Sequence, residues 1–459
     1  MTTTASVPAA RTAEPATEGA APPAALSRRV RVGYASGALA SGTFTTLPGL
    51  LLLPYLTDTL GIGAALAGVA VLVPKAWVAL VNPVVGRLSD RTRSRWGARG
   101  PWVLGGGLAM ALAFALMFAG LARGAAGAWV TEAGFLLTAT AFACFQIPYA
   151  ALPAELAPPG PEQVRLVGGR VVALGLAALT AGAVAPALID AGGGGVAGHR
   201  WAGLFGGTVI AAGALGVFLA ARSVPAEPVL HSASGIRLQL AVARGNRPFM
   251  ALLRAAAAQT VATGVLLAGT PYAAAQVLPG PGWAGALVAV FVAPNLISTP
   301  VWSRLGARIG PRRAYSAACA LFGAGCLLFL AAPLLPPAAV LATMALAGAG
   351  HAGQLLFLYA LLPDCIARET ARTGTRQGGV LAGLFSTAEA IGLALGPFLY
   401  AVVLQAFGYL SSDSGQAAEQ SSLARFGVLT GMAVVPVLAT TAAVALLRAY
   451  RPGPAGAGS

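Results

Sequence analysis

Residues 255–303 read AAAAQTVATGVLLAGTPYAAAQVLPGPGWAGALVAVFVAPNLISTPVWS and contain no Asp, Glu, Lys or Arg. A second stretch, residues 314–363, is equally free of these charged residues. A helix that spans a bilayer needs about 20 mostly apolar residues, so each stretch is long enough for two helices and a turn. The segments 279–282 (PGPG) and 333–337 (PLLPP) supply the two turns. Both stretches therefore predict pairs of membrane-spanning helices.

The composition of the whole chain of 459 residues agrees with this prediction. Hydrophobic residues make up 57% of it and charged residues only 9%, with a mean hydropathy of +0.76. Ordinary soluble domains are about 25% charged. Because 29 Lys and Arg and 14 Asp and Glu cannot cover a globule of this size, the composition argues against a soluble enzyme and against a disordered chain.

The same pattern of apolar runs and polar turns continues along the sequence. It predicts an all-α integral membrane protein with twelve transmembrane helices. The predicted spans are residues 33–56, 65–86, 101–122, 129–153, 167–189, 201–221, 249–276, 283–303, 314–335, 338–362, 379–404 and 426–448.

Basic residues indicate the orientation of these helices. All of the 29 Lys and Arg residues except five lie in the N-terminal tail, in alternate loops or after the last span. The opposite loops hold Arg123, Arg200 and Arg425, while Lys75 and Arg254 fall inside spans. Because cytoplasmic loops carry the excess of Lys and Arg, we expect a multi-pass protein of the inner (cytoplasmic) membrane with both termini in the cytoplasm. The net charge of +15 then needs no nucleic-acid partner.

The two halves of the sequence resemble each other. Residues 82–88 (NPVVGRL) match residues 299–305 (TPVWSRL), and residues 149–155 (YAALPAE) match residues 359–365 (YALLPDC) at nearly the same offset. These matches predict a six-helix unit used twice. Paired halves with a site between them are the architecture of secondary transporters, although duplication alone also fits some channels.

This duplication divides the chain into two bundles and three connecting or terminal segments. We predict a disordered cytoplasmic tail (1–31), an N-terminal six-helix bundle (32–221), a cytoplasmic linker (222–247), a C-terminal six-helix bundle (248–448) and a short cytoplasmic tail (449–459).

The loop after the second span carries the strongest motif. Residues 86–97 (GRLSDRTRSRWG) resemble the cytoplasmic motif of the major facilitator superfamily, in the form found in glycoside–pentoside–hexuronide:cation symporters, the relatives of melibiose permease. Residues 57–61 (TDTLG) and 147–155 (IPYAALPAE) resemble two further signatures of that family. Ala98 and Gly100 depart from the pattern, because arginines are usual there. The resemblance implies alternating-access transport of a small organic solute, a sugar or glycoside by default, by a monomer in the lipid bilayer.

Charged residues in the cytoplasmic loops are candidates for gating. Asp90 stands at a helix end, where it can pair with a neighbouring helix terminus and hold the two halves together. The alternative is that the loop charges only fix the orientation of the protein. The gating candidates are Asp90, Arg91, Arg95, Asp364 and Arg376.

Ionisable residues at membrane depth are candidates for function, because each costs roughly 2.5–3.5 kcal/mol on insertion. Lys75 and Glu389 lie at similar depths in the second and eleventh spans, which the resemblance places face to face. Glu389 is therefore expected either to carry a proton or to form a fixed ion pair with Lys75 in an uncoupled transporter. A third alternative is that Glu389 packs elsewhere.

The resemblance also implies which residues contact the substrate and the coupling ion. Val78 and Asn82 stand where coupled relatives carry two carboxylates, and Gln146 replaces another. These departures weaken the expectation of sodium coupling, so the coupling ion, a proton or sodium, stays open. We expect no cofactor and no bound metal. The substrate-binding candidates are Lys75, Asn82, Gln146, Tyr149, Arg170, Gln354 and Glu389, and for each the alternative is a hydrogen bond that joins two helices.

The sequence lacks the marks of a membrane-embedded enzyme. Its three histidines are widely spaced and its four cysteines show no metal-ligand spacing. We therefore expect a transporter, with an exporter of drugs or metabolites as the alternative to a sugar importer. A transporter fold that has become a sensor is a further alternative.

Overall fold

The computed structural model describes residues 26–97, 99–156, 161–222, 245–278, 282–373, 378–412 and 418–448. Within these ranges the chain forms helices and no strands, which confirms the all-α prediction. The two predicted tails, except for the last residues of the first, and most of the predicted linker lie outside the described residues. The predicted domain boundaries therefore stay a prediction.

Long helices make up nearly all of the described chain. In order they are α1 Arg28–Leu47, α2 Ala64–Arg91, α3 Gly100–Met117, α4 Gly124–Leu156, α5 Pro161–Ala191, α6 Gly195–Ala221, α8 Arg247–Gln276, α9 Trp283–Ile309, α10 Pro311–Leu328, α11 Pro337–Thr373, α12 Gly378–Ala406 and α13 Ser422–Arg448. Two π-helical segments, η1 Pro48–Leu52 and η2 Tyr55–Thr59, follow α1, and the 3₁₀ segment η3 Phe329–Leu334 follows α10.

Eleven of the described helices are long and apolar enough to cross a membrane, and each coincides with one predicted span. The first predicted span, 33–56, is the exception. That segment is helical from Arg28 to Thr59, but wider π-helical turns begin at Pro48 and interrupt the α-helix. Such π-turns often occur at functional positions. Because the interruption keeps this segment from being one long α-helix, the total of twelve spans stays a prediction.

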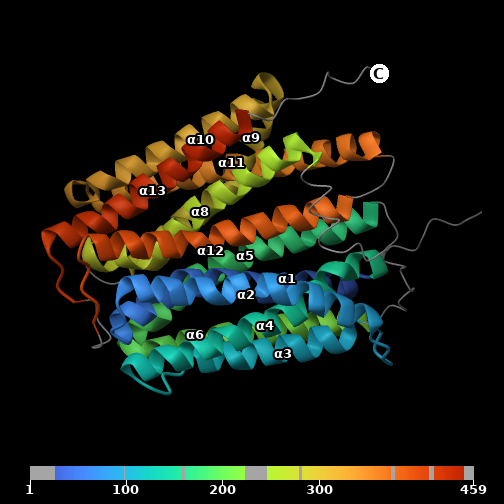
Figure 1. Ribbon diagram of the computed structural model, residues 1–459, viewed down its shortest axis with the longest axis horizontal. Coiled ribbons are helices and arrows are strands. Elements are labelled where there is room, and N and C mark those ends of the chain that lie inside the picture. Colours follow the sequence, from blue (N-terminus) through green and yellow to red (C-terminus); the bar gives the residue numbers. More distant parts are fainter. Residues whose placement is uncertain are drawn as a thin grey trace, which may run out of the picture.

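The helices form two groups, which lie one above the other in Figure 1. In the first half, α1 packs on α5 and α6, and α3 packs on α4 and α6. In the second half, α8 packs on α12 and α13, and α11 packs on α9 and α10. The halves meet where α2 lies against α12, α5 against α9, and η1 against α8.

The two ends of the bundle differ in charge. The end at which α1 begins and α2 and α13 finish, here called the basic end, carries Arg28, Arg91, Arg308 and Arg448. The opposite end, here called the far end, holds the α12–α13 connection.

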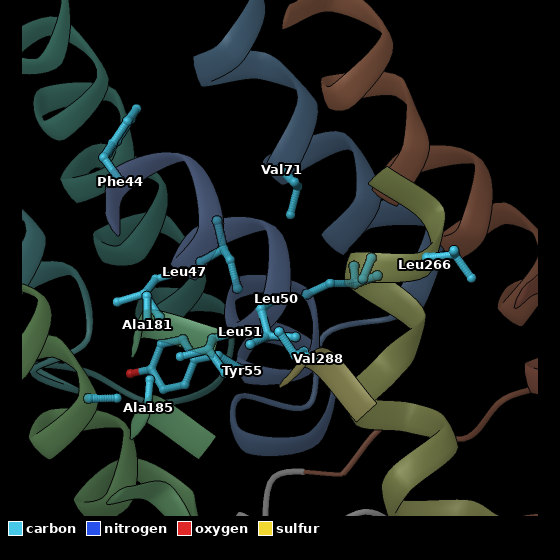
Figure 2. Packing of buried hydrophobic residues seen from close by; sticks show 14 of the residues in the cluster. Phe44, Leu47, Leu50, Leu51, Tyr55, Val71, Ala181, Ala185, Leu266 and Val288 are labelled. Atoms are coloured by element: carbon cyan, nitrogen blue, oxygen red, sulfur yellow. The ribbon is translucent and has the colours of Figure 1, made fainter. Parts of the chain in front are cut away.

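Buried apolar side chains join the two halves toward the far end. Leu50 and Leu51 of η1 lie beside Leu266 of α8 and Val288 of α9 in one continuous cluster, as Figure 2 shows. A second cluster consists only of side chains from the second half near the basic end, with Phe249 among its members. The described cores therefore connect the halves toward the far end and leave the second half with a core of its own at the basic end.

Glycines allow α8 and α12 to pack closely. A Cβ atom on Gly396 of α12 would lie 2.6 Å from the backbone of Gly264 in α8, and one on Gly264 would lie 2.8 Å from the carbonyl oxygen of Leu393. Small residues permit such backbone contact in membrane helices. The pairing of α8 with α12 therefore depends on these two glycines.

We predict that Gly396→Ala lowers the thermal stability of the protein, because the added methyl group must displace backbone. Overpacking of this kind costs about 1–3 kcal/mol. Gly383→Ala on the same helix is the matched control, since its Cβ would meet nothing within 4 Å. Thermal unfolding of the purified proteins in detergent measures both, and equal melting temperatures for the two variants would contradict the prediction.

Candidate functional site

Lys75 reaches from one half of the protein to the other. Its Nζ atom donates to the backbone carbonyl oxygen of Leu393 on α12 at 3.4 Å. Pro397 lies four residues after Leu393, inside the same helix. Because proline has no N–H group, the Leu393 carbonyl lacks its usual helical donor, and the Lys75 ammonium supplies the missing hydrogen bond.

Glu389 has a different partner from the one expected. Its Oε2 atom accepts a hydrogen bond from the Tyr359 hydroxyl of α11 at 3.0 Å, and the side chain is half-buried. Between these described residues, no ion pair joins Glu389 to Lys75. The fixed ion pair is thus not formed in this conformation, because Glu389 stands one helical turn from Leu393, toward the basic end.

Arg170 of α5 lies against a pair of tyrosines in the first half. Its Cζ atom is 5.1 Å from the centre of the Tyr149 ring, and that ring is 4.9 Å from the ring of Tyr34. The Tyr149 hydroxyl donates to the Tyr34 carbonyl oxygen at 2.9 Å and is fully buried. Arg170 stands on α5, the helix of the first half that packs against α9 of the opposite half.

Two amide candidates lie in the first half. Gln146 of α4 is half-buried and accepts a hydrogen bond from the Ser41 hydroxyl of α1 at 2.6 Å. Asn82 is half-buried on α2, seven residues after Lys75 and therefore on the same face of the helix. No hydrogen bond links the Asn82 side chain to another described residue.

Gln354 is not brought to these residues. It is fully buried, and its Nε2 atom donates to the Sγ atom of Cys319 on α10 at 3.4 Å. His351, one turn earlier, packs beside the rings of Phe291 and Phe322. Both polar side chains therefore face the interior of the second half and join α11 to its neighbours.

The gating candidates are only partly described. The side chains of Asp90 and Asp364 and all of Arg376 lie outside the described residues. Arg91 and Arg95 are exposed at the basic end, and the Arg95 guanidinium lies 4.9 Å from the centre of the Trp96 ring. Gating by these residues stays a prediction.

Metal ligands do not gather in the described ranges. No three side chains of His, Cys, Asp or Glu come together there in a way that could hold a metal ion. The expected coupling ion, proton or sodium, is not tested by this observation.

The sequence that forms these two groups of helices matches a known family. A family model described as MFS/sugar transport protein matches residues 33–451. The chain belongs to this family. A glucuronide carrier protein homolog of Escherichia coli (strain K12) is 26% identical over 423 residues, which cover 90% of each chain. A symporter of Bacillus subtilis (strain 168) is 26% identical and covers 90% of this chain and 89% of its own.

Solved structures show the same fold. A bacterial homolog of the human lysosomal transporter Spinster, in an inward-facing and unoccupied conformation, superimposes with a TM-score of 0.70 at 16% identity and covers 93% of this chain and 98% of its own. As a member of the MFS/sugar transport protein family, the chain is a multi-pass membrane protein that transports small solutes by secondary active transport. It is a transporter and not an enzyme.

Sequence reasoning gave no role to a set of residues that closes the far end of this transporter. The Tyr409 hydroxyl, after α12, lies 3.1 and 3.2 Å from the two carboxylate oxygens of Asp58 in η2. Thr57 and Tyr272 of α8 share a hydrogen bond of 2.8 Å. We call these four residues the far-end gate. The sequence signal for it was an acidic residue placed directly after an apolar span.

Gln420 joins the two described parts of the α12–α13 connection, residues 407–412 and 418–421. Gln420 accepts a hydrogen bond from the Leu410 N–H at 2.9 Å and donates to the Leu410 carbonyl oxygen at 2.8 Å. Two more hydrogen bonds join residues 411 and 412 to the first half. The Ser411 hydroxyl donates to the Ile62 carbonyl oxygen at 2.8 Å, and the Ser412 N–H donates to the Thr57 carbonyl oxygen at 2.9 Å.

We predict that Lys75 and Pro397 are energetically coupled. Alanine at position 397 restores an N–H group that can bond the Leu393 carbonyl. Loss of the Lys75 ammonium should therefore destabilise the Pro397→Ala protein less than it destabilises the wild type. A double-mutant cycle of Lys75→Met and Pro397→Ala should therefore give a coupling of about 0.5–3 kcal/mol in the free energy of unfolding.

Unfolding of the purified proteins in detergent measures this coupling. The cycle cancels the separate effect of removing a buried charge, because Lys75→Met removes it in both backgrounds. Lys75→Met combined with Pro436→Ala on α13 is the control and should be additive. Additivity of Lys75→Met with Pro397→Ala would refute the coupling.

Proposed function

We propose that this transporter carries a sugar or glycoside that bears a carboxylate across the cytoplasmic membrane by alternating access. The observation that carries this proposal is the position of Lys75. Its ammonium lies between the halves, and its one hydrogen bond to a described residue goes to a carbonyl oxygen of the other half. A buried ammonium without an anion is costly, so an anionic substrate would gain more there than a neutral one.

The charges around Lys75 support the same conclusion. Arg170 adds a second positive charge at the boundary between the halves, whereas Glu389 adds one carboxylate that already accepts the Tyr359 hydroxyl. The names of relatives agree: one is a glucuronide carrier protein homolog and another a putative glycoside/cation symporter, both of Escherichia coli (strain K12). A glucuronide is a glycoside with a carboxylate.

We also propose that the basic end faces the cytoplasm, with both termini there. The proposal follows from the excess of arginines at that end. Hydrogen bonds between described residues of the two halves lie at the far end or near the middle of the helices, as between the Gly282 N–H and Asp190 at 3.0 Å. This conformation would therefore be closed to the outside, and we expect a monomer to complete the cycle.

Proton coupling through Glu389 is the mechanism that we propose. Glu389 sits on α12 beside the other half, and the Tyr359 hydroxyl can stabilise its carboxylate form. Sodium favours several oxygen ligands, and Val78 together with Asn82 offers one amide where coupled relatives carry two carboxylates. A proton needs only one carboxylate.

The substrate proposal predicts a charge-selective effect of Lys75→Gln. In proteoliposomes, we expect 4-nitrophenyl β-glucuronide to enter with a lower KM than 4-nitrophenyl β-glucoside, which differs from it only at C6. A hydrogen bond to a charged group is worth about 1.5–3 kcal/mol, so Lys75→Gln should raise the KM for the glucuronide about 10- to 100-fold and change that for the glucoside little.

Arg254→Gln on α8 is the matched control, because it removes another cation from a span near the basic end. It should leave both KM values near those of the wild type. The proposal of an anionic substrate would be wrong if Lys75→Gln raised the KM for both substrates alike. It would also be wrong if the wild type had the lower KM for the glucoside.

The coupling proposal predicts that Glu389→Gln abolishes accumulation driven by a pH gradient. The wild type should accumulate substrate when the vesicle interior is alkaline and should ignore a sodium gradient. The variant should still equilibrate substrate, since an amide can accept the Tyr359 hydroxyl but cannot carry a proton. Equal responses of both proteins to the pH gradient would show that Glu389 is not the carrier. Efflux instead of uptake in whole cells would favour an exporter.

A further inference from the structure

The far-end gate places a carboxylate between the two halves of the transporter. Asp58 stands in the π-helical segment η2, past the end of the first predicted span, and its side chain is half-buried. Both of its oxygens face the hydroxyl of Tyr409, which belongs to the second half. This carboxylate therefore loses water when the halves close at the far end and regains it when they part.

Among the described residues, no cation lies against Asp58 in the closed gate. The described groups that face it from the second half are tyrosines. Tyr409 is in direct contact, the Tyr272 ring of α8 lies 5.2 Å from the Tyr409 ring, and the Tyr400 ring of α12 lies 5.7 Å from that of Tyr272. On its own segment, the neighbouring Thr57 hydroxyl bonds to the Leu53 carbonyl oxygen and to the Tyr272 hydroxyl. All of these groups are neutral hydroxyls.

The described residues of the first-half helices packed on η2, α2 and α6, place no Lys or Arg against Asp58. On α6, the His199 ring lies 4.7 Å from the ring of Tyr55, and the Arg200 guanidinium donates to the Ala119 carbonyl oxygen at 2.6 Å. On α2, the first ionisable residue is Lys75, three turns into the helix. Burial without a counter-ion accordingly raises the pKa of the Asp58 carboxyl to about 7.

We infer that Asp58 is a proton-binding residue of the far-end gate, and that its protonation favours closure of this gate. The inference goes beyond the proposed function, and rests on it only for the orientation that places the gate outside. The neutral acid fits the desolvated contact, whereas the carboxylate is better solvated when the gate is open. The proton stays on Asp58 while the gate is closed, so no covalent step is involved.

The direction of the pH effect follows from the two states. An aspartate in water titrates near about 4, and in the closed gate it titrates near about 7. The closed form thus binds the proton more tightly, and acid favours it. Closure is fully promoted below about pH 4, weakens as the pH rises, and reaches its minimum above about pH 7. Between full protonation and full deprotonation of Asp58, the ratio of closed to open protein changes by about a thousandfold.

A distance measurement on the full-length protein in nanodiscs tests the inference without any substrate. Spin labels at Leu121 and Leu334, which are 66% and 87% exposed at the far end of the first and second halves, report opening of the gate. The four native cysteines are first changed to alanine. We expect the wild-type population with the short distance to grow as the pH falls from 8 to 4.5.

Three variants test whether Asp58 causes this pH response. Asp58→Asn should stay closed at every pH, because its neutral amide imitates the protonated acid. Tyr409→Phe should move the midpoint to higher pH, because it removes a hydrogen bond that favours the carboxylate. Glu419→Gln, which removes an exposed carboxylate from the same loop, should behave as the wild type.

Several results would overturn the inference. They are a wild-type distance that does not change with pH, a wild-type pH response in Asp58→Asn, an unshifted midpoint in Tyr409→Phe, and loss of the response in Glu389→Gln. If Asp58→Asn fails to fold, the pH titration of the wild type and the shifted midpoint of Tyr409→Phe still test the inference. Uptake assays report independently on the substrate and coupling proposals, since the gate measurement contains neither glycoside nor gradient.

Discussion

Lipid offers no hydrogen bonds, so every polar group of the backbone must find a partner inside the protein. The arrangement of the candidate substrate site depends on which donor bonds to one such carbonyl group. Pro397 leaves the Leu393 carbonyl of α12 without a helical donor, and Lys75 of α2 provides one from the other half. A proline in one bundle thereby sets the position of a cation that belongs to the other. The same contact gives the ammonium a partner that a bound anion could replace.

The packing around this contact explains why the halves can move as units. Gly264 and Gly396 let α8 and α12 touch through their backbones beside Leu393, the residue that Lys75 contacts. Toward the far end the cores of the halves are continuous, and at the basic end the second half keeps a core of its own. A rotation about the middle of the helices could therefore exchange the two ends without dismantling either bundle.

Much of this architecture could be predicted from the sequence, because apolar length, loop arginines and repeated segments are local signals. Eleven spans and the all-α fold follow from them, whereas the family was indicated by the resemblance of residues 86–97 to a known motif. The partners of the polar side chains could not be predicted in the same way. Lys75 and Glu389 lie at similar depths, yet a carbonyl freed by Pro397 competes for the ammonium and Tyr359 binds the carboxylate.

Other differences arose from the orientation of helices about their own axes. Gln354 was expected at the substrate, but α11 turns it toward Cys319 of α10. The contact between Asp58 and Tyr409 joins residues 351 positions apart, and neither apolar periodicity nor charge counting links such distant positions. The π-helical turns after Pro48 also change which side chains of the first span face the second half.

The bonds of Gln420 to Leu410 have a consequence for the speed of the transport cycle. A flexible loop would have to lose backbone entropy each time it met the first half, at roughly 1–2 kcal/mol for each residue that becomes ordered. The described residues that Gln420 already holds together avoid their share of that loss. Their few hydrogen bonds to the first half can therefore be weak and still be sufficient, and weak bonds break quickly. Preorganisation here favours rapid turnover over a long-lived closed state.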